Sequence, residues 1–492
     1  MKGTRRLAIA AALALLTVLL AVAAACGGSE EAAPPAAEPP AEPAPAEPPP
    51  PAESEPAAES EPAETAGGSG LGSEFDVASA GDVNLKLWWL GDLEAPGIEA
   101  WMDQMIQDFQ TEYPNVTIEA TTYDTNTWIQ TQQTACQSTT GPDLWYNWSG
   151  TWSLELAWKG CTVPNEEVLA PADIEANANV QETIWDGKGW VLPLYRFVYP
   201  IVVNLDLIEQ AGLDPNTPPA TWEEWTAALE EIKAAGITPI ALGLKDGFGG
   251  EIAAAGQLEK QWVNQPDDIK QLVIDGDFST DPGWNAWLEK MFELQPYFND
   301  DANSLTFAEG LALWQNGETA MVFGAPGVQS VIKAAQDAGV NVGLMRMPPF
   351  DDGEWAESLV QTGQGFQVTQ WSENKEVAGA FMAFLQEPEN AAALYEATGN
   401  FPATSNWDPA SASSPTDQQM LEWLGEKGDA YWAANYTPVD LDVNGTFVVF
   451  QKMMAGELAD AAAAAQVYQD VIEKWREANP GTVENFQSWL GS

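Results

Sequence analysis

The chain contains no histidine among its 492 residues, and this absence limits the chemistry available to it. Histidine is the commonest general base of enzymes, the usual partner of serine and cysteine nucleophiles, and a frequent zinc ligand. Its absence excludes those triads and most zinc sites. The segment 275–284 spaces acidic residues like the start of a calcium loop but lacks the glycine and glutamate that such loops need, which indicates a solvated turn. We expect no metal and no cofactor.

Basic residues are scarce, with 19 Lys and Arg against 73 Asp and Glu, for a net charge of −54. Too few cations are present to displace the counterions of a phosphate backbone, so nucleic acid is excluded as a partner. Anionic lipid would be repelled and anionic substrates attracted poorly. Salt adaptation and simple solubilisation are both consistent with this acidity.

Cysteine is also rare, with three residues in the chain. Cys26 ends the apolar N-terminal segment, which leaves Cys136 and Cys161 in the folded part. In an exported protein two such cysteines favour a disulfide, and two separate thiols are the alternative.

The N-terminus has the features of an export signal. MKGTRR is basic, LAIAAALALLTVLLAVAAA is apolar, and small residues precede Cys26, so we predict a signal peptide over residues 1–25. The Ala24-Ala25-Cys26-Gly27 ending resembles a bacterial lipobox, which implies lipidation of Cys26 and a membrane-anchored lipoprotein at the outer face of the cell membrane. An uncleaved anchor is the alternative, and the sequence leaves open whether export uses the general or the twin-arginine route.

A segment of biased composition follows. Residues 29–65 consist almost entirely of Ala, Pro, Glu and Ser, and GGSGLGS follows at 67–73. Such a segment has no large apolar side chains to offset the entropy of ordering. We therefore predict a disordered tether over residues 26–82.

From Val83 onward, strand patterns alternate with helix patterns, as expected of an α/β protein with a mostly parallel sheet. Strands are expected at 83–90, 116–123 and 143–148, with helices between them. Two long extended segments, near 192–204 and 358–371, are expected to cross between two lobes. The fold class predicted is therefore α/β with two lobes, a hinge and a cleft between the lobes.

The stretch GPDLWYNWSGTW (141–152) contains three tryptophans. Trp145 lies early in a buried strand and is expected in the core. Trp148 and Trp152 flank the strand's carboxyl end, where open α/β sheets bind ligands, so both are candidate contacts together with Asn147 and Ser149. Five further tryptophans have helical spacing, which favours the core: Trp222, Trp225, Trp284, Trp287 and Trp314.

Several stretches together resemble the bacterial extracellular solute-binding proteins of family 1, the substrate-binding lipoproteins of carbohydrate ABC transporters related to maltose-binding protein. They include GPDLWY, LPLYRFVYPIVVNLDLIEQAGLDPNTPPATWEEW, AAGITPIALGLKDGF, LWQNGETAMVFGAPG, FQVTQWSENKEVAGAFMAFL and ATGNFPA. The resemblance covers about residues 83–492. It implies a type II periplasmic-binding-protein fold, with an N-terminal lobe of residues 83–197 and 362–403 and a C-terminal lobe of residues 198–361 and 404–492.

The resemblance also implies ligand contacts at matching positions. Asp92, in the loop WLGD after the first strand, is the main polar candidate, because one carboxylate accepts two hydroxyl hydrogen bonds. Helix capping is its alternative role. Gly327 stands where relatives often have an aromatic side chain, which leaves the identity of the ligand open. The implied contacts are Trp89, Asp92, Asn147, Arg196, Tyr199, Asp246, Phe248, Phe323, Gln361 and Gln364.

The function expected is that of an extracytoplasmic receptor, not an enzyme, that binds a sugar or oligosaccharide and delivers it to permease subunits. It is expected to act as a monomer. An exported glycosidase or lyase is the alternative from another class. A third possibility keeps the fold and changes the ligand to a polyol, an amine or a glycerol phosphoester.

Overall fold

The computed structural model describes residues 70–177, 181–250, 255–324, 327–412, 414–427 and 430–491. The described residues all lie within one compact unit of the chain, Thr65–Ser492. The predicted signal peptide, Cys26 and most of the predicted tether lie outside the described residues. In the part of the chain that is described, no helix has the length and apolar character that a membrane crossing needs.

Residues 70–82, which we assigned to the tether, pack on the folded part. They form two short 3₁₀ helices, Gly72–Glu74 and Val77–Ser79, and the first of them contacts α13 (Lys375–Leu385). Gly72 N donates to Val168 O at 3.0 Å, and the side chain of Val77 is 2% exposed. Burial of Val77 offsets the entropic cost of ordering this stretch. The Ala, Pro and Glu residues upstream have no large apolar side chain that could do the same.

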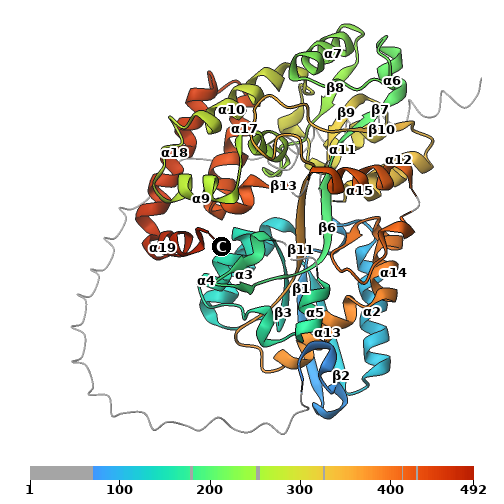
Figure 1. Cartoon of the computed structure of the whole chain (residues 1–492), viewed down its shortest axis with the longest axis vertical. Helices are drawn as coiled ribbons and strands as arrows, with labels where there is room; N and C mark the ends of the chain where they lie inside the picture. The colour runs from blue at the N-terminus through green and yellow to red at the C-terminus, as the bar shows by residue number, and fades with distance from the viewer. Residues whose placement is uncertain are drawn as a thin grey trace, which may run out of the picture. The chain divides into compact units, whose positions relative to one another are not determined.

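A seven-stranded mixed sheet forms the first lobe (Figure 1). β1 pairs in parallel with β2 and β3, β11 runs antiparallel to β3 and β6, β12 pairs with β6, and β13 pairs with β11. The strands are β1 (Val83–Trp89), β2 (Val116–Thr122), β3 (Leu144–Trp148), β6 (Leu192–Tyr199), β11 (Val360–Val368), β12 (Phe401–Pro402) and β13 (Ala430–Tyr431).

A four-stranded sheet of order β10-β7-β9-β8 forms the second lobe. Its strands are β7 (Ile201–Asn204), β8 (Thr238–Ala241), β9 (Thr319–Phe323) and β10 (Val342–Met345), and a separate hairpin joins β4 (Ile184–Trp185) to β5 (Lys188–Gly189). The chain changes sheets at Pro200, between β6 and β7, so the first predicted extended segment does connect the two sheets. The fold class is therefore α/β with two lobes, as predicted.

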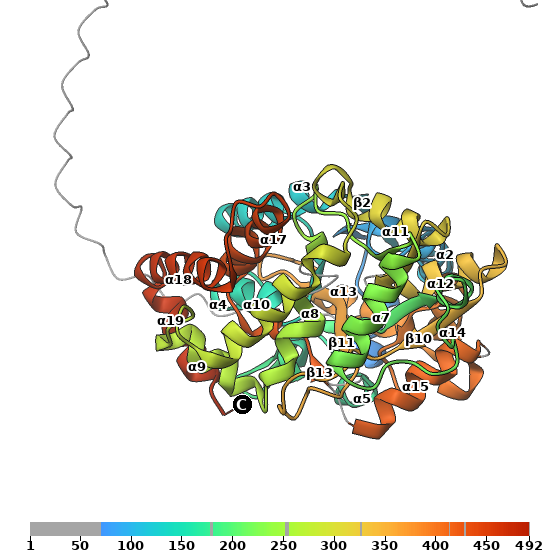
Figure 2. The same cartoon turned by 90° about the horizontal axis from the view of Figure 1, so that it is seen from above.

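Helices flank both sheets. In chain order they are α2 (Ile98–Glu112), α3 (Thr125–Ser138), α4 (Thr151–Trp158), α5 (Pro171–Ala176), α6 (Leu205–Gln210), α7 (Trp222–Ala234), α8 (Gly256–Leu258), α9 (Pro266–Asp275), α10 (Pro282–Leu294), α11 (Phe307–Gln315), α12 (Val328–Asp337), α13, α14 (Pro388–Thr398), α15 (Pro415–Lys427), α16 (Val439–Leu441), α17 (Phe447–Met454), α18 (Ala461–Ala478) and α19 (Pro480–Trp489). Seen from above, α17, α18 and α19 gather on one side of the second lobe, and α12 and α15 lie away from them (Figure 2).

Local sequence explains several of these elements. Apolar residues alternate along β1, and the alternate side chains are buried, as in a strand with one face on a core. Helix α7 begins at Thr221, whose hydroxyl accepts from Glu224 N at 3.2 Å, while the Glu224 carboxylate accepts from Ala220 N at 2.9 Å. The tryptophans with helical spacing are buried in the core of the second lobe, as expected.

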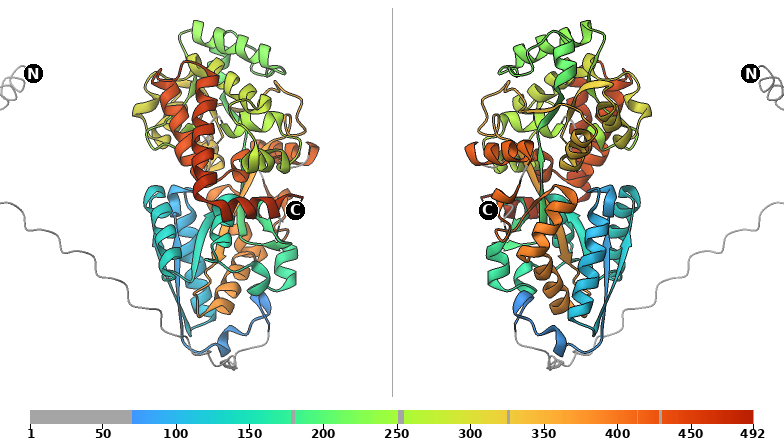
Figure 3. Two further views of the ribbon diagram at one scale, coloured as in Figure 1. Left: turned by 90° about the vertical axis from the view of Figure 1, so that its left-hand side faces the viewer. Right: turned by 90° about the vertical axis from the view of Figure 1, so that its right-hand side faces the viewer.

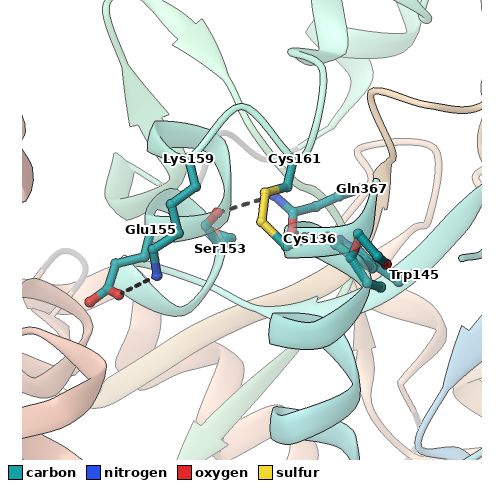
Figure 4. The surroundings of a disulfide bond; sticks show 9 residues. Cys136, Trp145, Ser153, Glu155, Lys159, Cys161 and Gln367 are labelled. Carbon is teal, nitrogen blue, oxygen red and sulfur yellow. Dashed lines mark hydrogen bonds and ion pairs between the residues drawn. A yellow bond between two sulfur atoms is a disulfide. The ribbon is translucent and has the colours of Figure 1, made fainter. Parts of the chain in front are cut away.

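A disulfide joins Cys136 in α3 to Cys161, just after α4 (Figure 4). The two Cα atoms are 5.3 Å apart. The disulfide therefore links α3, which precedes β3 in the sequence, to the loop after α4, which follows β3. Beside it, Lys159 forms an ion pair with Glu155 at 3.3 Å (Figure 4).

The last helix, α19, lies where the two lobes meet (Figure 3). It packs on α9 and α18 of the second lobe and on α4 of the first. Trp489 Nε1 donates to Ile184 O at 2.8 Å, and Trp185 Nε1 donates to Ser488 Oγ at 2.9 Å. The C-terminal helix therefore attaches the β4–β5 hairpin to the second lobe.

Candidate functional site

A pocket of about 1030 Å³, partly open to solvent, lies between the two lobes. The first lobe lines it with the loop after β1, the start of α3, the end of β3, the start of α4 and one face of β11. The second lobe contributes the loop after β8, the start of α11 and the start of α17. The pocket therefore lies at the carboxyl ends of β1 and β3, where parallel strands of open sheets present ligand-binding loops.

Six of the described residues that line the pocket are aromatic. Trp148 and Trp152 come from the first lobe, with ring centroids 5.0 Å apart in an edge-to-face arrangement. The remaining aromatic lining residues are Phe248, Phe307, Trp432 and Phe447. Phe447 follows a π-helical turn, Asp442–Thr446, a local irregularity that is frequent at functional sites.

Glu94 is the most buried carboxylate in the pocket wall, with 8% of its surface exposed. Its Oε1 accepts from Trp148 Nε1 at 2.9 Å. Burial raises the pKa of the Glu94 carboxyl from 4.5 to about 7, and the hydrogen bond from Trp148 opposes that rise. Near neutral pH this carboxyl can therefore be either a donor or a charged acceptor.

Asp92, our main polar candidate, has the capping role that was its alternative. Its Oδ1 accepts from Gly97 N at 3.1 Å and from Glu99 N at 2.9 Å, and its own N–H donates to Glu99 Oε1 at 3.1 Å. Its side chain is exposed and is not among the pocket-lining residues. Capping of α2 holds the loop so that Glu94, two residues further on, faces the pocket.

Two hydrogen-bonded groups support the pocket floor. Gln364 Oε1 accepts from Tyr146 Oη at 2.6 Å, and Tyr146 Oη lies 2.8 Å from Tyr195 Oη. Asn435 Nδ2 donates to Glu182 Oε1 at 3.0 Å and to Thr362 Oγ1 at 3.1 Å. These bonds fix the orientation of the Gln364 and Asn435 amides, both of which line the pocket.

The second lobe contributes one carboxylate, that of Asp246. Its Oδ2 accepts from Phe307 N at 3.0 Å at the start of α11. Phe248, two residues further, has its ring centroid 5.7 Å from that of Phe307. The loop after β8 and the start of α11 thus form one wall.

The structure brings five of the sequence-predicted contacts together at the pocket: Trp148, Trp152, Asp246, Phe248 and Gln364. Trp89, Asn147, Ser149, Tyr199, Phe323 and Gln361 are instead buried within the lobes. Asn147 Nδ2 donates to Trp152 O at 2.9 Å, and Ser149 Oγ donates to Gly363 O, so these two hold the backbone behind the tryptophans. Both side chains are buried, and their polar groups pair with nearby backbone carbonyls, as buried polar groups do.

The other predicted residues have supporting positions. The Tyr199 ring lies 5.0 Å from Trp432, between centroids, and so supports a pocket-lining side chain from behind. Arg196 Nη1 donates to Gln361 Oε1 at 3.3 Å, linking β6 to β11 next to the crossing. Phe323 packs against Trp225, and Trp89 belongs to the core of the first lobe.

Sequence reasoning missed pocket residues that lie far apart in the chain. They are Leu93, Glu94, Thr125, Ile129, Phe307, Ala308, Thr362, Trp432, Asn435 and Phe447. Glu94 stands in the stretch GDLEAPG, next to the candidate Asp92, but acidic residues are too abundant for one to be informative. No local sequence pattern marked Trp432 and Phe447 as pocket residues, because their place there depends on how the C-terminal segments pack beside β11.

The sequence was compared with known families and proteins. The family model for bacterial extracellular solute-binding proteins matches residues 95–392, more than half of the chain. The chain belongs to this family. The resemblance stated from the sequence is thereby confirmed.

The sequence identity between this solute-binding protein and individual relatives is low. A curated relative, the sn-glycerol-3-phosphate-binding periplasmic protein UgpB of Pectobacterium atrosepticum, is 28% identical over 41% of this chain and 45% of its own length. The chain thus spans less than half the length of that relative. A solved chitin oligosaccharide binding protein has a TM-score of 0.72 at 21% identity, covering 80% of this chain and 98% of its own.

A second solved structure shows the same fold. The bacterial solute receptor AcbH, described as having an exclusive preference for β-D-galactopyranose, has a TM-score of 0.67 at 19% identity, covering 81% of this chain and 99% of its own. At such identities the likeness establishes the two-lobed fold of the solute-binding protein, and its ligand must be argued from its own pocket.

Replacing Glu94 by glutamine should change how the stability of the solute-binding protein depends on pH. Because the folded-state pKa of Glu94 is raised, its contribution to stability is fully present below about pH 4.5 and is lost as pH rises through about 7. The variant should therefore lie within about 1 kcal/mol of the wild type at pH 5 and gain about 3 kcal/mol relative to it at pH 8. Urea unfolding at both pH values measures this.

The comparison between variant and wild type removes the background of other titrating groups. Glu259, with a pKa raised to about 8, acts in the same direction, whereas Lys260, with a pKa lowered to about 7, gains stability as pH rises. The exposed Asp337→Asn is the control and should follow the wild type at both pH values. If the free energies of unfolding of Glu94→Gln and the wild type differ by the same amount at pH 5 and at pH 8, the raised pKa of Glu94 is contradicted.

Proposed function

We propose that this solute-binding protein binds a sugar or short oligosaccharide in the pocket between its lobes and delivers it to the permease subunits of an ABC importer. The aromatic pocket with a few buried hydrogen-bonding groups carries this proposal. Indole and phenyl faces pack on the apolar faces of sugar rings, and amide and carboxylate groups at fixed positions match hydroxyls. Closure of the lobes would be favoured by the ligand's higher affinity for the closed form.

The charge of the pocket argues against the ligand named for the curated relatives. Two carboxylates, Glu94 and Asp246, line the pocket, and its described lining residues include no lysine or arginine. A phosphoester needs cationic or clustered N–H donors to offset its charge on transfer from water. We therefore favour an uncharged or cationic ligand over a glycerol phosphoester.

The cellular setting proposed is that of a lipoprotein. Cleavage before Cys26 and lipidation of that cysteine would place the chain at the outer face of the cell membrane, with the acidic Pro-rich segment as a tether. The membrane would then be a partner through this anchor, and the receptor would act as a monomer without catalytic activity. The lobe division that we propose stays close to residues 83–197 and 362–403 against 198–361 and 404–492, with all of β6, β11 and β13 counted in the first lobe.

A thermal-shift screen of the purified chain with neutral monosaccharides and oligosaccharides tests the function. A specific ligand should raise the melting temperature with its concentration and change the tryptophan fluorescence, because Trp148, Trp152 and Trp432 line the pocket. A parallel assay for new reducing ends should show no turnover. Release of reducing ends from a glycan would favour the alternative, a glycosidase or lyase.

A further inference from the structure

We propose that the preferred ligand is a sugar that carries a free, protonated amino group, with Glu94 as the partner of that ammonium. This inference rests on the proposed function and narrows it to a substrate class. Three features of the pocket carry it, namely its charge, its balance of hydrogen-bond donors and acceptors, and its aromatic wall.

The described residues that line the pocket include two carboxylates and no lysine or arginine. Glu94 and Asp246 line it from opposite lobes. A third carboxylate, Glu182, lies fully buried directly behind the floor, in contact with Thr362 and Asn435. A cationic ligand brings an opposite charge to the Glu94 and Asp246 carboxylates in a cavity where charge pairing is stronger than in water, whereas a neutral ligand does not.

Three residues that line the pocket offer acceptor oxygens to a ligand. Asn435 uses its Nδ2 for Glu182 and Thr362, which leaves its Oδ1 as the acceptor toward the pocket. Glu94 and Asp246 add carboxylate oxygens. Donors are present too, because Gln364 keeps its Nε2 when its Oε1 accepts from Tyr146, and Trp432 Nε1 has no hydrogen-bond partner among the described residues. An ammonium brings three donors and no acceptor, which matches the acceptor oxygens of Asn435, Glu94 and Asp246.

The aromatic wall suits a cation as well as a sugar ring. Tryptophan is the best cation–π partner among the side chains, and Trp148 and Trp152 stand beside Glu94. The same chain already uses this chemistry in its interior, where Lys270 Nζ lies 4.4 Å from the centroid of Trp489. At the pocket, the Trp148 indole and the Glu94 carboxylate are joined by a hydrogen bond, so one site offers a ring face and an opposite charge together.

Burial of Glu94 reinforces the preference. Desolvation by burial makes this carboxyl resist ionisation. An ammonium placed against it supplies the missing counter-charge in a medium where charge pairing is stronger than in water. A hydroxyl at the same place gains a single hydrogen bond.

Matched sugars test the inference directly. Glucose, galactose and mannose are each compared with their 2-amino-2-deoxy and 2-acetamido-2-deoxy forms, by thermal shift and by titration calorimetry at pH 7. In at least one series the amine should bind at least tenfold more tightly than its hydroxyl and acetamido counterparts. In Glu94→Gln that ratio should fall below threefold. Glu259→Gln, which removes a buried carboxylate outside the pocket lining, should keep the wild-type ratio.

The outcomes separate the two proposals. If a neutral or N-acetylated sugar binds as tightly as its amine or more tightly, the amino-sugar inference is overturned and the sugar-receptor function stands. If no sugar of any series binds and no oligosaccharide of the thermal-shift screen binds, or if sn-glycerol 3-phosphate binds more tightly than every sugar, both are overturned. The wild-type ratios decide the matter even if Glu94→Gln fails to fold.

Discussion

Replacement of Trp148 by alanine is expected to weaken sugar binding by about 30- to 100-fold while the protein stays folded. The indole forms part of the pocket wall, packs edge-to-face on Trp152 and donates to Glu94. Loss of a central aromatic contact of this kind typically costs about 2–3 kcal/mol of binding free energy. Titration calorimetry with the best sugar of the thermal-shift screen measures the change.

Two further variants separate the contributions to this effect. Trp148→Phe keeps an aromatic ring but removes the N–H donor to Glu94, and we expect an intermediate loss. Trp371→Ala removes a half-buried indole of the same lobe that is outside the pocket lining and donates to Pro142 O at 3.0 Å. It should leave affinity unchanged. An unaltered affinity in Trp148→Ala would exclude the pocket as the ligand site.

Replacement of Trp489 by alanine is expected to destabilise the fold by about 3–5 kcal/mol. The side chain is 1% exposed and packs against Trp158, Tyr436 and Phe486. It also donates to Ile184 O at 2.8 Å and lies under the ammonium of Lys270. Its removal creates a cavity, leaves a backbone carbonyl without its indole donor and removes the cation–π contact of a buried lysine. Urea unfolding measures the loss.

The control for this variant is Leu93→Ala, because Leu93 is 61% exposed and should change stability by less than about 0.5 kcal/mol. If the two variants unfold at the same urea concentration, the aromatic cluster around α19 contributes little. If Trp489→Ala also loosens the β4–β5 hairpin, hydrogen exchange should rise there as well as in α19.

Much of the fold could be predicted from the sequence because its signals are local. Alternation in β1, the capping pair at Thr221 and Glu224, and helically spaced tryptophans such as Trp284 report on burial within one element. The same holds for Trp145, whose place early in an apolar strand predicted its complete burial. The long extended segment at 192–204 indicated the connection between the two sheets.

The site was only partly predictable, because which groups face the pocket is decided by packing. Asp92 and Glu94 are two carboxylates in one loop, and the hydrogen bonds from Gly97 and Glu99 turn the first to cap α2. Asn147 and Ser149 lie in the predicted stretch, yet the adjoining backbone takes up their polar groups. Residue type and spacing are the same for either arrangement, so the sequence does not distinguish them.

The sequence by itself determined the acidic, histidine-free character of the protein, its α/β class, its family and the tryptophan-rich strand end at the site. Those properties reside in composition, periodicity and the order of motifs. The tertiary structure alone decided that Glu94 and Trp148 act as a pair and that Trp432, Asn435 and Phe447 complete the pocket from the C-terminal region. Contacts between residues hundreds of positions apart follow from how the sheets and helices pack, which no local pattern encodes.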